Sequence, residues 1–145
     1  MRTLTRLLLS LMFVLLFTAS TVAQEALWKE LNSKAIMLQK RGEYSEGAKV
    51  AEEALKVAEK TFGSDHAYVA ISLNTLAWLY EDQGKYGEAE PLYERSLVIR
   101  EKVLGPDHPD VATALENMAD CYRKLGKTNE AGELEARARK IRSKQ

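Results

Sequence analysis

The sequence repeats itself with a period of about 42 residues, and this repetition constrains the fold more than any other feature. The clearest copy lies at 71–108, and parts of it return before and after it. Three positions recur in every copy: a glycine at 42, 84 and 126, a leucine at 31, 73 and 115, and an alanine at 35, 77 and 119. Self-similarity at a fixed period is typical of proteins built from stacked copies of one structural unit. The sequence therefore predicts a repeat architecture.

Each copy has the pattern of two helices joined by a glycine turn. Apolar residues recur at three- and four-residue spacing, which puts them on one helix face, and glycine accepts the left-handed conformation common at a helix end. In the loop before the third helix, Ser64 or Asp65 is expected to cap that helix by accepting from its free N–H groups. No alternating strand pattern is present in the sequence. Helices are predicted at about 25–41, 45–62, 67–82, 87–104, 109–125 and 129–142.

The six predicted helices form three antiparallel pairs, with repeats at about 26–66, 67–108 and 109–143. One pair cannot bury its apolar face alone, whereas about three stacked pairs can. The last helix carries charge on its outer faces, as a terminal repeat needs because nothing stacks on it. We therefore expect one all-α domain over residues 24–145.

Residues 1–23 have the layout of a secretory signal peptide. Two arginines form a basic start, an apolar run with one serine follows, and the small residues Thr21 and Ala23 stand at a cleavage site. The apolar run is short for a membrane-spanning helix, which needs ~20 apolar residues. We expect cleavage after Ala23 and a periplasmic or secreted mature protein. The alternative is an uncleaved anchor, since the segment spans a membrane if it is tilted.

The charge balance and the cysteine count exclude several classes of protein. The chain has 21 Lys and Arg against 21 Asp and Glu, and loss of residues 1–23 removes two arginines and no acid. A nucleic-acid-binding protein would show a strong basic excess, so we expect no nucleic-acid partner. The single Cys121 excludes an intrachain disulfide and a cysteine-rich metal site.

The recurring residues resemble those of the tetratricopeptide repeat (TPR) family, and the period resembles its kinesin light chain type. The stretch LGPDHPDVA at 104–112 is similar to kinesin light chain repeats, whereas Lys34, Gly47 and Thr128 depart from the family pattern. The resemblance covers residues 26–143 and implies a right-handed α-solenoid of three antiparallel helix pairs. The middle repeat carries the family's packing positions most fully, at Leu73, Leu76, Ala77, Tyr80, Gly84, Tyr86, Ala89, Tyr93 and Leu97.

The resemblance also implies a binding surface, because in this family the first helix of each pair lines a concave groove. Asn both donates to and accepts from the backbone of an extended peptide, and Trp supplies apolar area with one N–H donor. Packing between repeats is an equal alternative for Trp78, and a plain solvated side chain is the alternative for Asn74. The expected partner-binding residues are Asn32, Ile36, Asn74, Thr75, Trp78, Glu81, Asn117 and Asp120.

No group of residues in the sequence points to catalysis, a cofactor or a metal. His66 and His108 lie one repeat apart and do not converge as zinc ligands do, and Cys121 lies within a predicted helix, as buried thiols often do. We therefore expect a non-catalytic protein–protein interaction module that binds a peptide or a partner helix in the groove. The alternative is a self-assembly unit, a homo-oligomer joined through the solenoid ends. Membrane contact is expected only through an uncleaved N-terminal segment.

Overall fold

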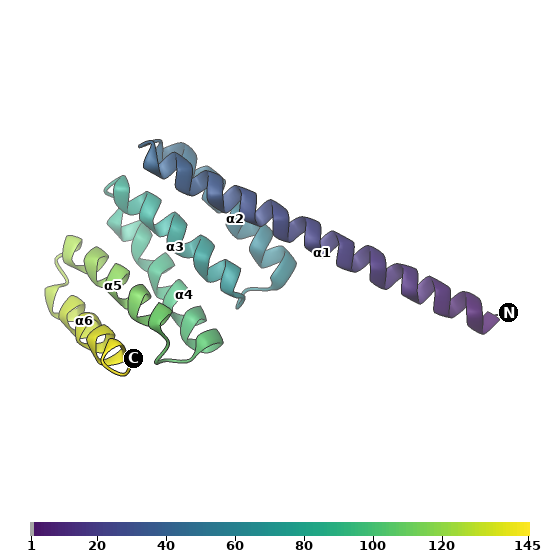
Figure 1. Cartoon of the computed structure of the whole chain (residues 1–145). Helices are drawn as coiled ribbons and strands as arrows, with labels where there is room; N and C mark the ends of the chain where they lie inside the picture. The colour runs from purple at the N-terminus through teal and green to yellow at the C-terminus, as the bar shows by residue number, and fades with distance from the viewer. Residues whose placement is uncertain (1) are drawn as a thin grey trace.

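The computed structural model describes residues 2–145, with side chains from Leu4 onward, and this part of the chain is a stack of helices without strands (Figure 1). Short loops join consecutive helices, which run antiparallel within each pair. The predicted all-α solenoid of three antiparallel helix pairs is confirmed. The helices are α1 (Arg2–Lys40), α2 (Tyr44–Phe62), α3 (Ala67–Asp82), α4 (Tyr86–Leu104), α5 (Pro109–Lys124) and α6 (Thr128–Arg142).

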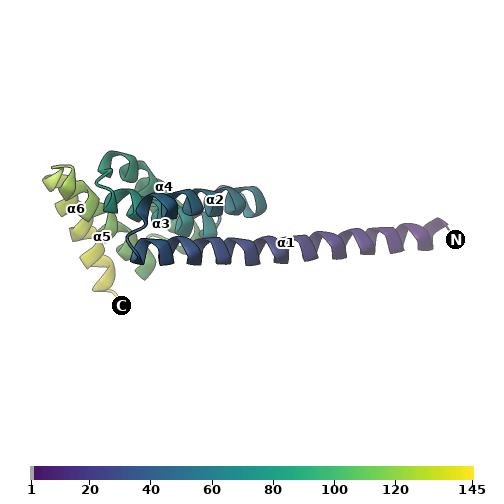
Figure 2. The ribbon, with the colours of Figure 1, turned by 90° about the horizontal axis from the view of Figure 1, so that it is seen from above.

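The first helix is longer than predicted. It begins at Arg2 rather than near residue 25 and continues to Lys40, because the sequence has no glycine or proline before Gly42 to end it. Its N-terminal half projects away from the stack in two views at right angles (Figures 1 and 2). In that half the large apolar side chains from Leu4 to Phe17 are each more than half exposed.

By length and composition, α1 is able to cross a membrane, and a signal sequence has the same properties. Cleavage after Ala23 therefore remains a prediction. The side chains that tie α1 to α3 include Glu25, whose Oε1 accepts a hydrogen bond from the hydroxyl of Tyr68 at 2.8 Å. Such contacts lie beyond the predicted cut, so the cut would leave them in the mature chain.

The turn inside each pair is closed by a glycine with positive φ. At Gly84 φ is 73°, and open space surrounds the position where a side chain would start, so conformation rather than crowding requires glycine there. The Lys85 N–H donates to the carbonyl of Tyr80 at 2.8 Å, and the Gly84 N–H donates to that of Glu81 at 2.8 Å. This pair of bonds is the Schellman motif, which satisfies carbonyls at a helix end. It sets the point at which α3 ends.

The helix that opens each later repeat is capped by a histidine. Nδ1 of His66 and Nδ1 of His108 each accept a hydrogen bond at 3.1 Å from the backbone N–H two residues later. The prediction that Ser64 or Asp65 is the cap is therefore wrong. The carboxylate of Asp65 instead pairs with Lys102 at the end of α4. Both histidines thus have a structural role at a helix N-terminus.

The core between the first two repeats depends on small residues. Ala51, Ala54 and Ala58 on α2 are fully buried, and α2 packs against both α1 and α3. A stripe of alanine allows two helix backbones to approach closely. The close approach leaves little room for larger side chains on α2.

One buried tryptophan joins α1 to α3. The indole N–H of Trp28 donates to the hydroxyl of Ser72 at 2.8 Å. The same ring stacks on Tyr68 with 3.8 Å between ring centroids. Trp28 is 5% exposed, so its N–H needs a partner inside the protein, and Ser72 supplies it.

A glycine and a leucine fit together where the first repeat departs from the family pattern. A methyl group on Gly47 would come within 2.7 Å of Leu79 Cδ2, which is closer than carbon atoms approach without a shift. One period later Ala89 stands at the position of Gly47, and Cys121 stands at the position of Leu79. The glycine is thus replaced by a larger residue and the leucine by a smaller one. Both later residues are buried in one cluster. The two repeats therefore fill similar space with different pairs of side chains.

We predict that Gly47→Ala and Leu79→Cys are coupled. Overpacking by one methyl group costs about 1–3 kcal/mol, which opposes the roughly 1 kcal/mol that alanine gains over glycine in a helix. In the Leu79→Cys background the clash is absent, so Gly47→Ala should become more favourable by about 1–3 kcal/mol. Urea unfolding of the wild type, both single variants and the double variant measures this. Additive effects would show that the two side chains do not compete for the same space.

Candidate functional site

Helices α1, α3 and α5 lie side by side along one face, which we call the inner face. The hydroxyl of Thr75 on α3 donates to Oδ1 of Asn32 on α1 at 3.1 Å. The side-chain amide of Asn117 on α5 donates to Oδ1 of Asn74 on α3 at 3.2 Å. Four of the predicted site residues therefore bond to one another in two pairs.

The burial of these four residues separates them into two groups. Asn74 is 4% exposed and Thr75 is 2% exposed, whereas Asn32 and Asn117 are half-buried. The alternative that Asn74 is a plain solvated residue is wrong, because it lies between α3 and α5 with its oxygen bonded. Asn74 and Thr75 therefore hold neighbouring helices together, and only Asn32 and Asn117 of this set also reach the surface.

The other three helices form a second layer, which we call the outer layer. Arg95 on α4 pairs with Glu59 on α2 at 2.6 Å. One period later Arg137 on α6 pairs with Glu101 on α4 at 2.5 Å. Figure 2 shows α2 and α4 together on one side of α1. Salt bridges thus join the outer layer, while neutral side-chain hydrogen bonds join much of the inner face.

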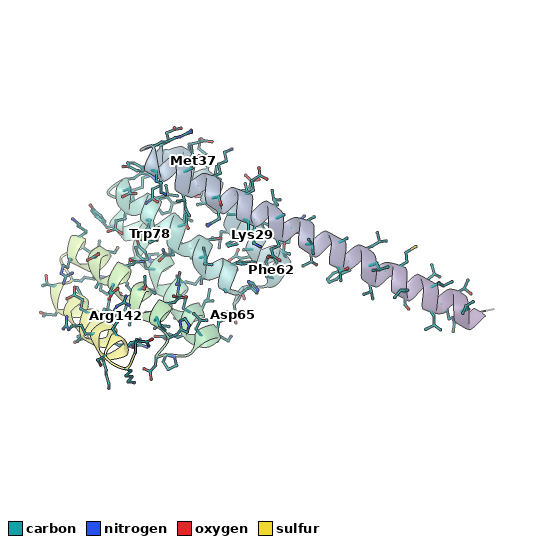
Figure 3. The ribbon with its side chains drawn as sticks, in the orientation of Figure 1. Lys29, Met37, Phe62, Asp65, Trp78 and Arg142 are labelled. Carbon is teal, nitrogen blue, oxygen red and sulfur yellow. The ribbon has the colours of Figure 1, made fainter. Side chains whose placement is uncertain are left out.

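Three predicted site residues stand at the same position in successive repeats. Ile36, Trp78 and Asp120 are one period apart, so they follow one another across α1, α3 and α5. Ile36 and Trp78 are half-buried, and Asp120 is exposed. Trp78 packs on the buried cluster that contains Ala89 and Cys121, and it keeps part of its ring at the surface of the middle helix (Figure 3). Trp78 thus packs between repeats and still reaches the surface, and its contact with a partner in the groove stays a prediction.

Acidic side chains lie beside Trp78. Oε2 of Glu81 accepts a hydrogen bond at 2.7 Å from the hydroxyl of Tyr93, which is 1% exposed. Burial raises the pKa of Glu81, and the negative charges of Asp120 and Asp82 raise it further. Burial is also the main cause that raises the pKa of Tyr93, with the bond to Glu81 second. The acidic end of α3 is therefore partly desolvated.

The sequence did not predict which residues of neighbouring inner helices form hydrogen bonds with each other. Four hydrogen bonds between neighbouring inner helices join residues 43 positions apart, one more than the period, whereas Trp28 and Ser72 are 44 positions apart. Gln39 Nε2 donates to Asp82 Oδ2 at 2.7 Å with this offset. A comparison of residues 43 positions apart, rather than 42, could have found these pairs. Stacked helices are slightly shifted along their axes, so each of these residues lies opposite the one that is 43 positions further along the chain.

Cys121, a residue type that serves as a nucleophile or metal ligand in other proteins, has a structural role in this chain. Burial raises the pKa of the Cys121 thiol to about 11, with Glu81 and Glu90 adding to the effect. The thiol is therefore protonated at neutral pH, and its sulfur donates to the carbonyl of Tyr86 at 3.5 Å. Within residues 2–145, no group of three or more His, Cys, Asp and Glu is placed to hold a metal ion.

Comparison with family models matches the tetratricopeptide repeat model to residues 25–97 and 80–144. The chain belongs to the tetratricopeptide repeat family. The two overlapping matches together extend over nearly all of the chain after the predicted cut. Proteins of the TPR family generally mediate protein–protein interaction. A search of curated protein sequences finds no match.

Solved TPR structures share the fold. BtubC (BKLC) from P. vanneervenii has a TM-score of 0.75 and 25% identity over 80% of this chain. The nearly identical kinesin light chain TPR-like repeats of Podosopora anserina have a TM-score of 0.73 and 28% identity over 80% of it. The chain spans only 46% and 55% of these two structures. The TPR domain of Arabidopsis FLU, at 18% identity and a TM-score of 0.74 over 84% of this chain and 99% of that one, shows the fold alone.

We predict that Glu81→Gln changes how stability depends on pH. The pKa of Glu81 is raised in the folded state, so the folded protein binds this proton more tightly than the unfolded chain does. Wild-type stability should therefore fall as pH rises from the unfolded value near 4.5 through the raised folded value. Glutamine carries no charge and still accepts from Tyr93, so the variant should lack this loss.

The measurement is urea unfolding of both proteins from about pH 4 to about pH 7, the range in which carboxyl groups titrate. The difference, wild type minus variant, should decrease with rising pH. Asp120→Asn should make the decrease smaller, because it removes one of the charges that act on Glu81. A difference that is constant with pH would contradict the assignment.

Proposed function

We propose that the mature chain is an exported TPR module that binds a segment of a partner protein along the inner face, without catalysing a reaction. The observation that carries this proposal is the partly exposed Trp78 on the middle inner helix. Ile36 precedes it on α1 and Asp120 follows it on α5. An apolar position, an aromatic ring and a carboxylate thus lie in a row that crosses all three repeats.

The polar atoms left over on this face suit an extended backbone. Asn117 donates one N–H to Asn74. Its oxygen has no partner within residues 2–145 and can accept from a peptide N–H. Asn32 accepts from Thr75, and its NH₂, which has no partner in the same part of the chain, can donate to a peptide carbonyl. Because the acidic residues lie beside Trp78, charge complementarity favours a partner segment with basic side chains.

Export is the second part of the proposal. The basic start, the apolar run and the small residues at Thr21 and Ala23 support a secretory signal, and the exposed apolar half of α1 agrees with a segment that leaves water. Removal of residues 1–23 places Gln24 at the N-terminus and keeps Glu25 and Trp28 for their bonds to α3. An uncleaved segment would instead hold the repeats at a membrane surface.

We predict that Trp78→Ala reduces partner capture by residues 24–145 from cell-envelope extract. Truncating an aromatic residue at the centre of an interface costs about 2 kcal/mol or more, which is a loss of roughly thirtyfold in affinity. Val98→Ala is the matched control, because Val98 is 61% exposed on the outer layer. Quantitative mass spectrometry of the recovered proteins makes the comparison, after circular dichroism shows that both variants fold.

Loss with Trp78→Ala and retention with Val98→Ala is the expected result. Equal recovery by all three proteins would place binding away from the inner face. Recovery of the chain itself alone would favour the alternative of self-assembly through the solenoid ends.

We predict that expression of the full chain in a Gram-negative bacterium yields a protein that begins at Gln24. A signal peptidase needs a small residue immediately before the cut, so Ala23→Leu should leave the N-terminal segment attached. Intact-mass spectrometry and fractionation of periplasm and membranes measure both. An uncut wild-type chain in the membrane fraction would show that the segment is an anchor.

A further inference from the structure

A small pocket lies away from Trp78, where α3 begins, α4 ends and α5 begins. Its volume is about 100 Å³, below the ~150 Å³ of a cavity that binds benzene, so it has room for one small aliphatic group. Val103 and Leu104, which line it, are 47% and 38% exposed. The pocket is lined by Ala67, Ala70, Ile71, Ile99, Arg100, Val103, Leu104 and Asp110.

Arg100 is the one feature of this pocket that its apolar walls do not explain. Its Nε is inaccessible to solvent, and the guanidinium has no hydrogen-bond or ion-pair partner in the part of the chain that the structure describes. An arginine remains charged under ordinary conditions. A partly buried charge without a partner is costly, because it loses hydration and gains nothing in return.

The third repeat has an arginine at the equivalent position, and there the guanidinium has hydrogen-bond partners. Arg142 stands one period after Arg100 and forms a bidentate ion pair with Glu116, with Nε–Oε1 at 2.7 Å and Nη2–Oε2 at 2.6 Å. Its Nη2 also donates to the hydroxyl of Thr113 at 3.3 Å. In that repeat the guanidinium therefore has a carboxylate and a hydroxyl from the neighbouring helix.

The middle repeat has replaced both of these partners. Ile71 stands where Thr113 would be, and Asn74 stands where Glu116 would be. The oxygen of Asn74 is already bonded to Asn117. Helix α3 therefore offers Arg100 an apolar side chain in place of the carboxylate and hydroxyl that α5 offers to Arg142.

Asp110 is the acid that lies nearest in the pocket wall, and it does not neutralise Arg100. Its charge favours the protonated guanidinium, against the burial that lowers the pKa of Arg100. However, its side chain is 58% exposed, and no hydrogen bond or ion pair joins it to Arg100 within residues 2–145. The pocket thus offers a cation and an aliphatic surface to a group from outside.

We propose that this pocket is a second contact site, which takes an acidic side chain of a partner segment together with the aliphatic side chain beside it. The carboxylate would bond to the terminal nitrogens of the Arg100 guanidinium, because Nε is inaccessible to solvent, and bidentate carboxylate bonds to arginine are among the strong ones. The aliphatic group would cover Ile71, Val103 and Leu104. The site does not depend on binding at the inner face.

The test is an NMR titration of the full chain in a non-denaturing detergent with short peptides whose ends are blocked. Acetyl-Ala-Leu-Glu-Ala-amide is compared with the same peptide carrying Gln for Glu, and with one carrying Ala for Leu. The expected result is saturable shifts of the Arg100 Nε–H and of the Ile71 and Val103 methyl groups. The Glu peptide should bind about tenfold more tightly than the Gln peptide, and the Ala peptide more weakly than the Leu peptide.

Arg100→Gln should remove the preference for the Glu peptide, whereas Arg142→Gln, at the paired equivalent position, should keep it. Methyl spectra establish that both variants fold. Equal affinity for the Glu and Gln peptides would overturn the proposal. So would an Arg100 Nε–H signal that moves on Asp110→Asn and stays unmoved by the peptides, because it would show an internal pair. Tighter binding of acetyl-Ala-Ala-Leu with a free carboxyl end would overturn the choice of an acidic side chain.

Discussion

The structure depends on how the polar side chains of the middle helix are satisfied. Residues 72–77 of α3 are all buried, because α1, α2, α4 and α5 surround this helix. Three of the six are polar, and a buried polar group without a partner costs about 1–3 kcal/mol. Ser72 and Thr75 bond to α1, and Asn74 bonds to α5. The same bonds that satisfy α3 therefore fix the neighbouring repeats beside it.

This arrangement explains why several polar side chains of the inner face bond to one another. Each helix pair buries its apolar face only against the next pair, so the inner helices must lie close together. Polar side chains at their borders then bond to one another, as Glu25 does with Tyr68 and Gln39 with Asp82. The row of Ile36, Trp78 and Asp120 keeps surface exposed on this face. Trp78 is the largest side chain in that row.

Much of the fold followed from the period, because regular spacing identifies helices and their turns directly. The turn at Gly84 could be predicted because its positive φ favours glycine. The buried face of α3 could be predicted from the spacing of its apolar residues. The pairing of Asn74 with Asn117 was not visible, because it depends on the shift between stacked helices. For the same reason Asn74 looked like a surface residue. The caps at His66 and His108 were missed because Ser and Asp are commoner caps.

Departures from the repeat are as informative as the repeat itself. Ion pairs such as Asp65 with Lys102 recur one period later as Asp107 with Lys144 at 2.8 Å, and exposed pairs of this kind contribute little to stability. At Gly47 the departure is matched by a change in the neighbouring side chain. At Arg100 no hydrogen bond or ion pair within residues 2–145 replaces the lost partners. The unmatched position is where a partner from outside has a physical reason to bind.

The central claim is that partners contact the inner face, and photo-crosslinking in living cells tests it most directly. A photoreactive amino acid replaces Ile36 on the inner face in one protein and Val98 on the outer layer in another. The account predicts a crosslinked partner from position 36 that is absent from position 98. A partner that is captured only from position 98 would contradict it.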